Sequence, residues 1–319
     1  MPIRFNLPGL GRNIGPLRAH QWQLDVAYRY LHTDQFYVGS EVNDSAGPFG
    51  TGPDITIHSW EFTLNYGLSN RVNLALRFPF AAGTVSRLYA DLNRHGNSAT
   101  GLGDISAIGT IWVWDPSKHP RGNLALGFGV KTPSGDNAVS GRVFPASGPP
   151  TRAPVDQPIQ LGDGGWGIIL QTQAYRTMSR RTSGYVNASY LLSPKETTDV
   201  LSPIPGRRWG APDIYSARLG VAYALLPEKA LSLSLGPRID GLPLRDLIGG
   251  NDGDIRRPGY TLFIDPGVTF THGRHTFWVN TPVRIHQDFK RSVADIEDNR
   301  LGGGDLAKYL VLTGYSIRF

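Results

Sequence analysis

Residues 60–80 read WEFTLNYGLSNRVNLALRFPF. On each side of the turn at 67–70, every second side chain is apolar, beginning with Trp60 in the first half and Val72 in the second. Successive side chains of a β-strand point to opposite faces, so a period of two indicates a strand with one apolar face. Two such strands joined by a short turn are expected to form an antiparallel hairpin.

The same alternation recurs from residue 21 to the end of the chain. Twelve segments carry it: 21–37, 54–66, 71–83, 101–115, 121–133, 164–178, 183–194, 213–226, 230–241, 258–271, 275–288 and 306–319. Each is long enough to cross a bilayer as a tilted strand of about 9–11 residues. The connections between them are alternately long and short, which is typical of a barrel with short periplasmic turns and long extracellular loops. We therefore predict an all-β fold, a closed antiparallel transmembrane β-barrel of about twelve strands.

The composition agrees with an exported barrel. The chain has 319 residues, no cysteine and a net charge of +6. It lacks an apolar run long enough for a membrane-spanning helix, but barrel strands need none because polar residues alternate with apolar ones. The charges are scattered singly, whereas a nucleic-acid binder gathers them into a cluster. The expected partners are therefore outer-membrane lipid, lipopolysaccharide and the barrel assembly machinery, together with a small-molecule solute, in the bacterial outer membrane.

Residues 1–19 are rich in Pro and Gly and do not resemble a strand. We treat them as a separate segment that either hangs in the periplasm or enters the lumen, and we assign residues 20–319 to the barrel. Residues 1–20 have no apolar centre typical of a signal peptide. Either a signal was removed and a start Met added, or the sequence is truncated, or the protein is not exported.

Charged side chains on the polar faces of the strands are expected to point into the lumen. By parity these are Glu61, Arg77, Asp104, Lys131, Arg218, Arg238, Asp240, Asp265, Arg284 and His286. Buried charges require partners or water. Two alternatives follow: the residues create a selectivity field along an open pore, or they form a salt-bridged interior that is nearly sealed.

Aromatic residues near the ends of the segments are expected to form the girdles at the two membrane borders. They are Tyr66, Trp112, Trp114, Tyr185, Tyr190 and Tyr260. The last segment carries Tyr315, Ile317 and Phe319 on one face, and a terminal aromatic on a final strand resembles the assembly signal of outer-membrane barrels. We expect this strand to pair with the segment 21–37 and to place the ring of Phe319 outward at the periplasmic rim.

Three glycine-rich motifs interrupt the alternation. They are GLGD at 101–104, KTPSGD at 131–136 and LGDGG at 161–165. Their order resembles a family of outer-membrane proteins associated with the phenol-degradation meta-pathway, whose members are often called transporters. The resemblance implies a transport class but no particular solute. The motifs themselves are interpreted as turns or bulges at the barrel rim, with ligand binding as the alternative. The long connection 134–163 is expected either to fold inward or to act as a lid.

The sequence offers little for catalysis or metal binding. His58 and Ser59 are neighbours in a strand and point to opposite faces, and His286 with Asp288 has no nucleophile beside it. The acidic loop 251–254 lacks the full ligand spacing of a calcium-binding loop, so a solvated turn is the preferred interpretation. We expect no cofactor, no metal and no enzyme activity.

The leading hypothesis is an outer-membrane channel for passive uptake of small, aromatic or hydrophobic molecules. The first alternative is a structural barrel with a closed lumen. The second is a lipid hydrolase with its site at the rim.

Overall fold

A computed structural model describes residues 16–43, 52–202, 206–249, 254–305 and 307–319. Its main sheet is antiparallel and closes on itself through twelve successive strands, which confirms the predicted fold class. The barrel is made of β1 (Trp22–Thr33), β4 (Asp54–Gly67), β5 (Val72–Leu88), β6 (Arg94–Leu102) with β7 (Ser106–Trp112), β8 (Gly122–Lys131), β11 (Gly167–Thr177), β12 (Thr182–Leu192), β15 (Ile214–Leu226), β16 (Leu231–Leu235) with β17 (Pro237–Leu242), β18 (Gly259–Ile264) with β19 (Gly267–His272), β20 (His275–Asn280) with β21 (Val283–Phe289), and β23 (Leu310–Arg318).

The barrel closes where the first strand meets the last. β1 pairs with β4 on one side and with β23 on the other, and Ile317 lies opposite Leu24. The backbone N–H of Phe319 donates to the carbonyl oxygen of Trp22 at 2.9 Å, so the pairing extends to the end of the chain. The predicted pairing of the last segment with 21–37 is therefore confirmed.

The two faces of each strand differ as the alternation predicts. In β4 the side chains of Phe62 and Leu64 are 43% and 40% exposed on the outside, whereas Glu61 and Thr63 are only 4% and 5% exposed on the inside. Large exposed apolar side chains recur on the outer face of most other strands, Phe128 in β8 and Leu219 in β15 among them. A continuous apolar outer face is stable in lipid and unstable in water.

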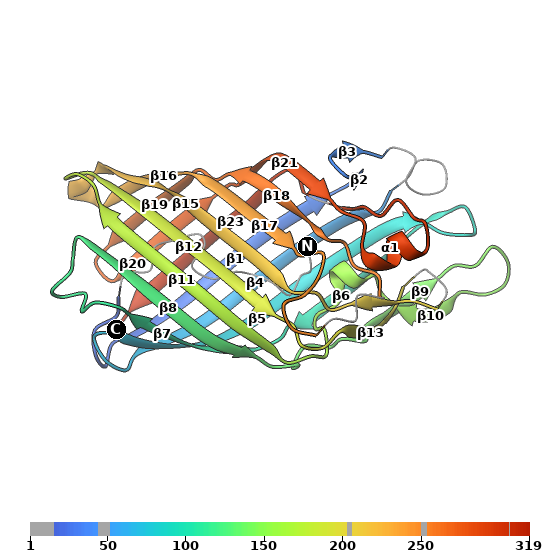
Figure 1. Ribbon diagram of the computed structural model, residues 1–319, viewed down its shortest axis with the longest axis horizontal. Coiled ribbons are helices and arrows are strands. Elements are labelled where there is room, and N and C mark those ends of the chain that lie inside the picture. The colour runs from blue at the N-terminus through green and yellow to red at the C-terminus, as the bar shows by residue number, and fades with distance from the viewer. Residues whose placement is uncertain (1–15, 44–51, 203–205, 250–253, 306) are drawn as a thin grey trace.

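The two ends of the barrel are unlike each other, as Figure 1 shows. The C-terminus lies near the end with short turns, and the other end carries extra small elements. These are β2 (Phe36–Val38), β3 (Glu41–Val42), β9 (Ser140–Val143), β10 (Thr151–Pro154), a 3₁₀ turn (Gln157–Ile159), β13 (Thr197–Leu201), β14 (Arg208–Gly210), α1 (Val293–Glu297) and β22 (Gly304–Asp305). We call the first end periplasmic and the second extracellular. Among the described residues, no helix has the length and apolar character needed to span a membrane.

Four strands are interrupted, although the sequence predicts continuous segments. Three of the breaks lie beside a proline, at Pro237, Pro266 and Pro282. Proline has no backbone N–H to donate to a neighbouring strand, so the regular hydrogen-bond ladder is weakened at these positions. The breaks lie at one level of the wall, because the N–H of Asp265 donates to Gly236 and that of Thr281 donates to Pro266.

The connection predicted at 84–100 is not an open loop. β5 continues to Leu88, and β6 pairs with it from Arg94 onward, so the two form a hairpin that rises past the rim. Its side chains lack the apolar alternation that marks a lipid-facing strand. Backbone pairing in water needs no apolar face, which is why the sequence pattern missed this extension.

The lipid-facing position of Phe62 gives a first prediction. Replacing it with Arg should lower the free energy of unfolding by about 2–4 kcal/mol, the typical cost of Arg on the lipid face at the bilayer centre. Leu68→Arg is the matched control, because Leu68 is 54% exposed in the turn after β4, at the periplasmic end. Denaturant unfolding in lipid vesicles measures both variants, and equal losses would contradict a lipid-facing β4.

Candidate functional site: a cavity in the extracellular half of the lumen

A cavity of about 250 Å³ lies inside the barrel, toward the extracellular end. Its walls come from several strands of the barrel, among them β4 with Ile57 and β18 with Phe263. Apolar lining residues include Leu31, Ile55, Ile57, Leu242, Phe263 and Leu310. A largely apolar cavity with a few polar groups is the usual form of a small-molecule site.

The second arm of the long connection 134–163 folds inward and closes one side of this cavity, whereas the β9–β10 hairpin in its middle extends beyond the extracellular end (Figure 1). Val155, Ile159 and Leu161 are 2%, 0% and 3% exposed and join a core cluster with the strand residues Ile55 and Ile57. The buried side chain of Gln160 donates to the carbonyl oxygens of Val139 and Val155, which holds the two arms of the loop together. Asp156, Gln157 and Pro158 therefore line the cavity from the loop side. Of the two expectations for this connection, the structure shows the inward fold for its second arm, residues 155–161.

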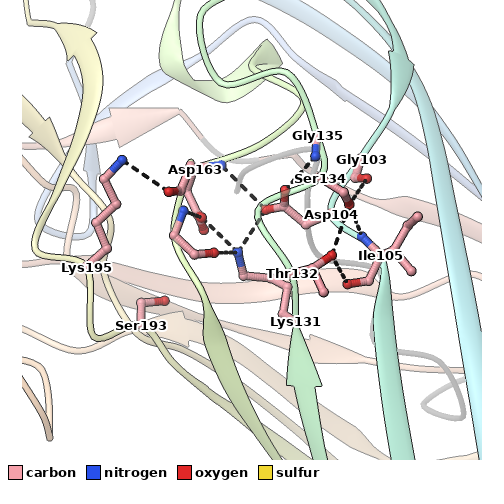
Figure 2. A network of polar contacts seen from close by, with 12 residues as sticks. Gly103, Asp104, Ile105, Lys131, Thr132, Ser134, Gly135, Asp163, Ser193 and Lys195 are labelled. Atoms are coloured by element: carbon pink, nitrogen blue, oxygen red, sulfur yellow. Dashed lines mark hydrogen bonds and ion pairs between the residues drawn. The ribbon is translucent and has the colours of Figure 1, made fainter.

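A buried ionic cluster ties this loop to the barrel wall. Figure 2 shows Lys131, at the end of β8, between Asp104 and Asp163. The Lys131 Nζ lies 2.8 Å from Asp104 Oδ2 and 2.7 Å from Asp163 Oδ1, and it donates to the carbonyl oxygen of Gly165 at 2.7 Å. All three charged side chains are at most 8% exposed. Asp104 also accepts from the backbone N–H of Gly135 at 2.9 Å, so both ends of the loop meet at one point. We call these three residues the Lys131 clamp.

The three glycine-rich motifs build this clamp. A Cβ on Gly162 would lie 2.4 Å from the carbonyl oxygen of Gly135, and a Cβ on Gly135 would lie 2.7 Å from that of Leu161. Only glycine permits such close backbone approach. The hydroxyl of Ser134 accepts from the N–H of Ile105 at 2.7 Å, which satisfies a backbone group freed by the break between β6 and β7. The motifs thus have a structural role at the barrel rim, in agreement with their interpretation as turns and bulges.

Below the cavity the lumen is packed with charged and polar side chains. Arg218 Nε lies 3.4 Å from Asp265 Oδ2, and Arg238 Nε lies 2.9 Å from Asp240 Oδ2. Arg77 donates to Gln171 at 3.3 Å, and Thr63 donates to Glu61 at 3.2 Å. These charged side chains are no more than 9% exposed. The interior at this level resembles the salt-bridged alternative more closely than a wide water-filled pore.

The upper part of the site also contains ion pairs from the loops. Arg87 Nη1 lies 3.1 Å from Asp156 Oδ1, and Arg256 Nη2 lies 2.9 Å from Asp246 Oδ2. Burial raises the pKa of the Asp156 carboxyl, and the facing Arg87 opposes that rise. Burial likewise raises the pKa of Asp246. Each carboxylate is therefore less stable in its ionised form than it would be in water.

Eight of the ten residues expected in the lumen are buried inside the barrel. They are Glu61, Arg77, Asp104, Lys131, Arg218, Arg238, Asp240 and Asp265. Arg284 is half-buried and donates to the hydroxyl of Tyr37 at 2.5 Å. His286 differs from the expectation, because it is exposed and lies beside Tyr260. The register between β18 and β21 shifts at this point: Arg284 lies opposite Phe263, and His286 lies opposite the preceding residue, Leu262. Because β21 has one extra residue here, Arg284 and His286 point to different faces of the sheet although they are two residues apart.

The expected aromatic girdle is only partly on the outside. Tyr66 packs against Trp22 with ring centroids 4.6 Å apart, Trp114 is 48% exposed, and Tyr190 and Tyr260 are half-buried. Trp112 and Tyr185 do not belong to the girdle, because they are 1% and 5% exposed. Both share the inward parity of their strands. The ring of Trp112 packs against Tyr175, and the hydroxyl of Tyr185 accepts from Arg218 at 2.7 Å.

At the last strand, Phe319 is 61% exposed and Tyr315 and Ile317 are half-buried on the same face. Their role as an assembly signal stays a prediction. Residues 1–15 and 250–253 lie outside the described residues, and with them most of the N-terminal segment 1–19 and of the acidic loop 251–254. In the part of the chain that is described, no group of three or more His, Asp or Glu side chains is arranged to hold a metal ion.

Two buried arginines are not among the ten residues expected in the lumen. Arg29 in β1 is 3% exposed and donates to the hydroxyl of Ser59 at 3.2 Å. Arg29 lies between Tyr28 and Tyr30 in an alternating segment, and this alternation indicates that its side chain points into the lumen. Arg256 is 2% exposed, but it lies in a connection without periodicity, and so the sequence contained no signal for its burial.

No family model matches this sequence, and no curated protein matches it. Among solved structures, the chain is similar to an outer membrane channel from Pseudomonas putida F1, with a TM-score of 0.61 and 14% identity over 96% of this chain and 97% of that one. The monoaromatic hydrocarbon channel CymD gives a TM-score of 0.45 and 8% identity over 95% and 89% of the two chains. A FadL homologue from Pseudomonas aeruginosa gives 0.43 and 12% over 94% and 89%. At this identity the first likeness concerns the fold. With the closed barrel and its apolar outer face, it establishes an outer-membrane β-barrel.

The Lys131 clamp gives a second prediction. Lys131→Met leaves the carboxylates of Asp104 and Asp163 buried without a cation, which typically costs about 3–5 kcal/mol. Amide hydrogen exchange at residues 155–162 should accelerate by about 100-fold or more, while exchange in β1 should change little. The triple variant Lys131→Met, Asp104→Asn, Asp163→Asn removes the unpaired charges and should recover part of the protection. Unchanged exchange in Lys131→Met would show that the clamp does not hold the loop.

Proposed function

We propose that the protein is an outer-membrane channel through which small, largely apolar molecules enter the cell. The observation that carries this proposal is the cavity of about 250 Å³ in the extracellular half of the lumen. Its position lets a solute arrive from outside, and its apolar lining offers the solute an environment that is more favourable than water by about 25 cal/mol per Å² of buried apolar surface.

The size of the cavity supports a small solute. A cavity of roughly 150 Å³ lined by Leu, Ile and Phe is sufficient for benzene. The present cavity is larger and is lined by the same kinds of side chain, including Ile57 and Phe263. An aromatic solute also agrees with the resemblance of the motifs at 101–104, 131–136 and 161–165 to the phenol-degradation family. Movement past the packed lower lumen is part of the proposal, and passive diffusion is its simplest form.

A structural barrel with a closed lumen is the second candidate. The observation in its favour is the packed layer beneath the cavity, in which Arg218 and Asp265 are 3% and 0% exposed. A purely structural barrel has no need of an apolar cavity above that layer. Saturable solute uptake separates the two candidates, because a structural barrel shows none.

A hydrolase at the rim receives little support from the geometry. His32 Nδ1 lies 3.1 Å from the Thr56 hydroxyl and 3.6 Å from Asp54 Oδ1. A catalytic triad needs the two ring nitrogens to face the nucleophile and the carboxylate separately. Here one nitrogen would have to serve both, so we do not assign this group a reaction.

The uptake of a radiolabelled monoaromatic solute by porin-poor Gram-negative cells tests the channel. Cells that produce the protein should take up the solute in a saturable manner. Leu242→Trp should reduce this uptake about tenfold or more, because Leu242 is a half-buried residue of the cavity wall and an indole there fills the space. Equal uptake by producing and non-producing cells would contradict the channel function.

Ile239→Trp is the matched control. Ile239 lies in the same strand, between the inward-facing Arg238 and Asp240, and is half-buried on the lipid side. An indole on that face is compatible with the membrane, so uptake should stay near the wild-type rate. A similar loss in both variants would indicate a general defect in the barrel and would remove the cavity from the explanation.

A further inference from the structure

The polar lining of the cavity has an excess of positive charge. Three arginines and two aspartates line it: Arg87, Arg256, Arg257, Asp156 and Asp240. Asp156 pairs with Arg87, and Asp240 pairs with Arg238 outside the lining. Arg256 and Arg257 are consecutive residues of the connection between β17 and β18, and Arg256 pairs with Asp246, which also lies outside the lining.

The backbone holds Arg256 firmly in this position. The N–H of Ile255 donates to the carbonyl oxygen of Arg208 at 2.9 Å, and the N–H of Gly210 donates to that of Ile255 at 2.8 Å. These two bonds join the connection to β14. The side chain packs beside this strand, since a Cβ built on Gly210 would lie in van der Waals contact with Arg256 Nε, 3.6 Å away. The guanidinium of the neighbouring Arg257 lies over the ring of Trp209, 5.2 Å from its centroid.

The guanidinium of Arg256 is buried but poorly satisfied. Its side chain is 1% exposed, and its only close anionic neighbour among the described residues is Asp246, 2.9 Å from Nη2. Nη2 therefore has Asp246 as its partner, whereas Nε and Nη1 have no hydrogen-bond partner among the same residues. A guanidinium has five N–H donors, and a buried donor that makes no hydrogen bond destabilises the protein.

Asp246 is an incomplete partner for this cation. Its Oδ1 accepts from the backbone N–H of Asp213 at 2.9 Å, so the carboxylate is shared between two donors. Asp213 in turn accepts hydrogen bonds from Ser193, Tyr190 and Leu247. A second carboxylate would therefore find donors on Arg256 that Asp246 leaves unused.

We infer that the cavity binds small apolar molecules that carry one carboxylate, and that Arg256 binds the carboxylate. This inference rests on the proposed function and names the class of solute. The planar guanidinium matches a carboxylate with two parallel hydrogen bonds. Its nitrogens are covered in the present conformation, so the side chain turns from Asp246 into the cavity to meet the solute. The apolar body of the solute then lies among residues such as Ile57, Phe263 and Leu310.

Isothermal titration of the purified full chain in detergent tests the inference with benzoate, benzyl alcohol and benzylamine. These probes share a ring and differ in charge. Benzoate should bind about 10- to 100-fold more tightly than benzyl alcohol, as expected for hydrogen bonds to a charged group, and benzylamine should bind most weakly. Arg256→Met should remove the preference for benzoate and leave the affinity for benzyl alcohol unchanged.

Two further variants complete the design. Arg245→Met removes a positive charge from an exposed position of the same connection and should keep the preference. Asp246→Asn removes the competing carboxylate and should tighten benzoate binding several-fold, which tests the inference even where Arg256→Met fails to fold. Benzyl alcohol binding as tightly as benzoate, or weaker benzoate binding in Asp246→Asn, would overturn the inference and leave the channel function standing. Binding of none of the three probes would count against both.

Discussion

The backbone of a strand in lipid has no water to bond with, and this constraint determines the rest of the structure. Every N–H and C=O in the membrane must be paired within the protein, so the sheet has to close. Closure is made by the pairing of β1 with β23, up to the bond between Phe319 and Trp22. Once the sheet is closed, alternate side chains must point either into lipid or into the lumen. The apolar outer face and the crowded polar interior are two consequences of one requirement.

The same requirement explains the breaks in the wall. Where Pro237, Pro266 and Pro282 interrupt the ladder, neighbouring backbone groups compensate, as in the bond from the N–H of Asp265 to Gly236. At the break between β6 and β7, the compensation comes from the loop that follows β8. Ser134 bonds to the freed N–H of Ile105, and the Lys131 clamp holds both ends of that loop at the same place. The loop then enters the lumen, where its apolar residues form one wall of the cavity. Thus the connection 134–163 both satisfies the backbone at the break in the wall and forms part of the candidate site.

Strand number, pairing order and the faces of most residues could be predicted from alternation, because in lipid the pattern must persist along each strand. The positions of Glu61, Arg77 and Arg218 follow from parity alone. Parity failed for His286, where a register shift in β21 reverses the faces. Distance from a turn predicts an outer position for Trp112 and Tyr185, but the parity of their strands places both side chains inside the barrel. The cavity could not be predicted, since it depends on a 30-residue connection and on Arg256, neither of which has a periodic pattern.

The central claim is that a small apolar molecule occupies the extracellular half of the lumen. A crystal structure of the protein soaked with bromobenzene tests it most directly, because bromine gives an anomalous signal that locates the ring without reference to a model of the ligand. The account predicts a peak among Ile57, Phe263 and Leu310, inside the barrel and beneath the loop that carries Ile159. Bromine peaks confined to the lipid-facing surface, with none in the lumen, would contradict it.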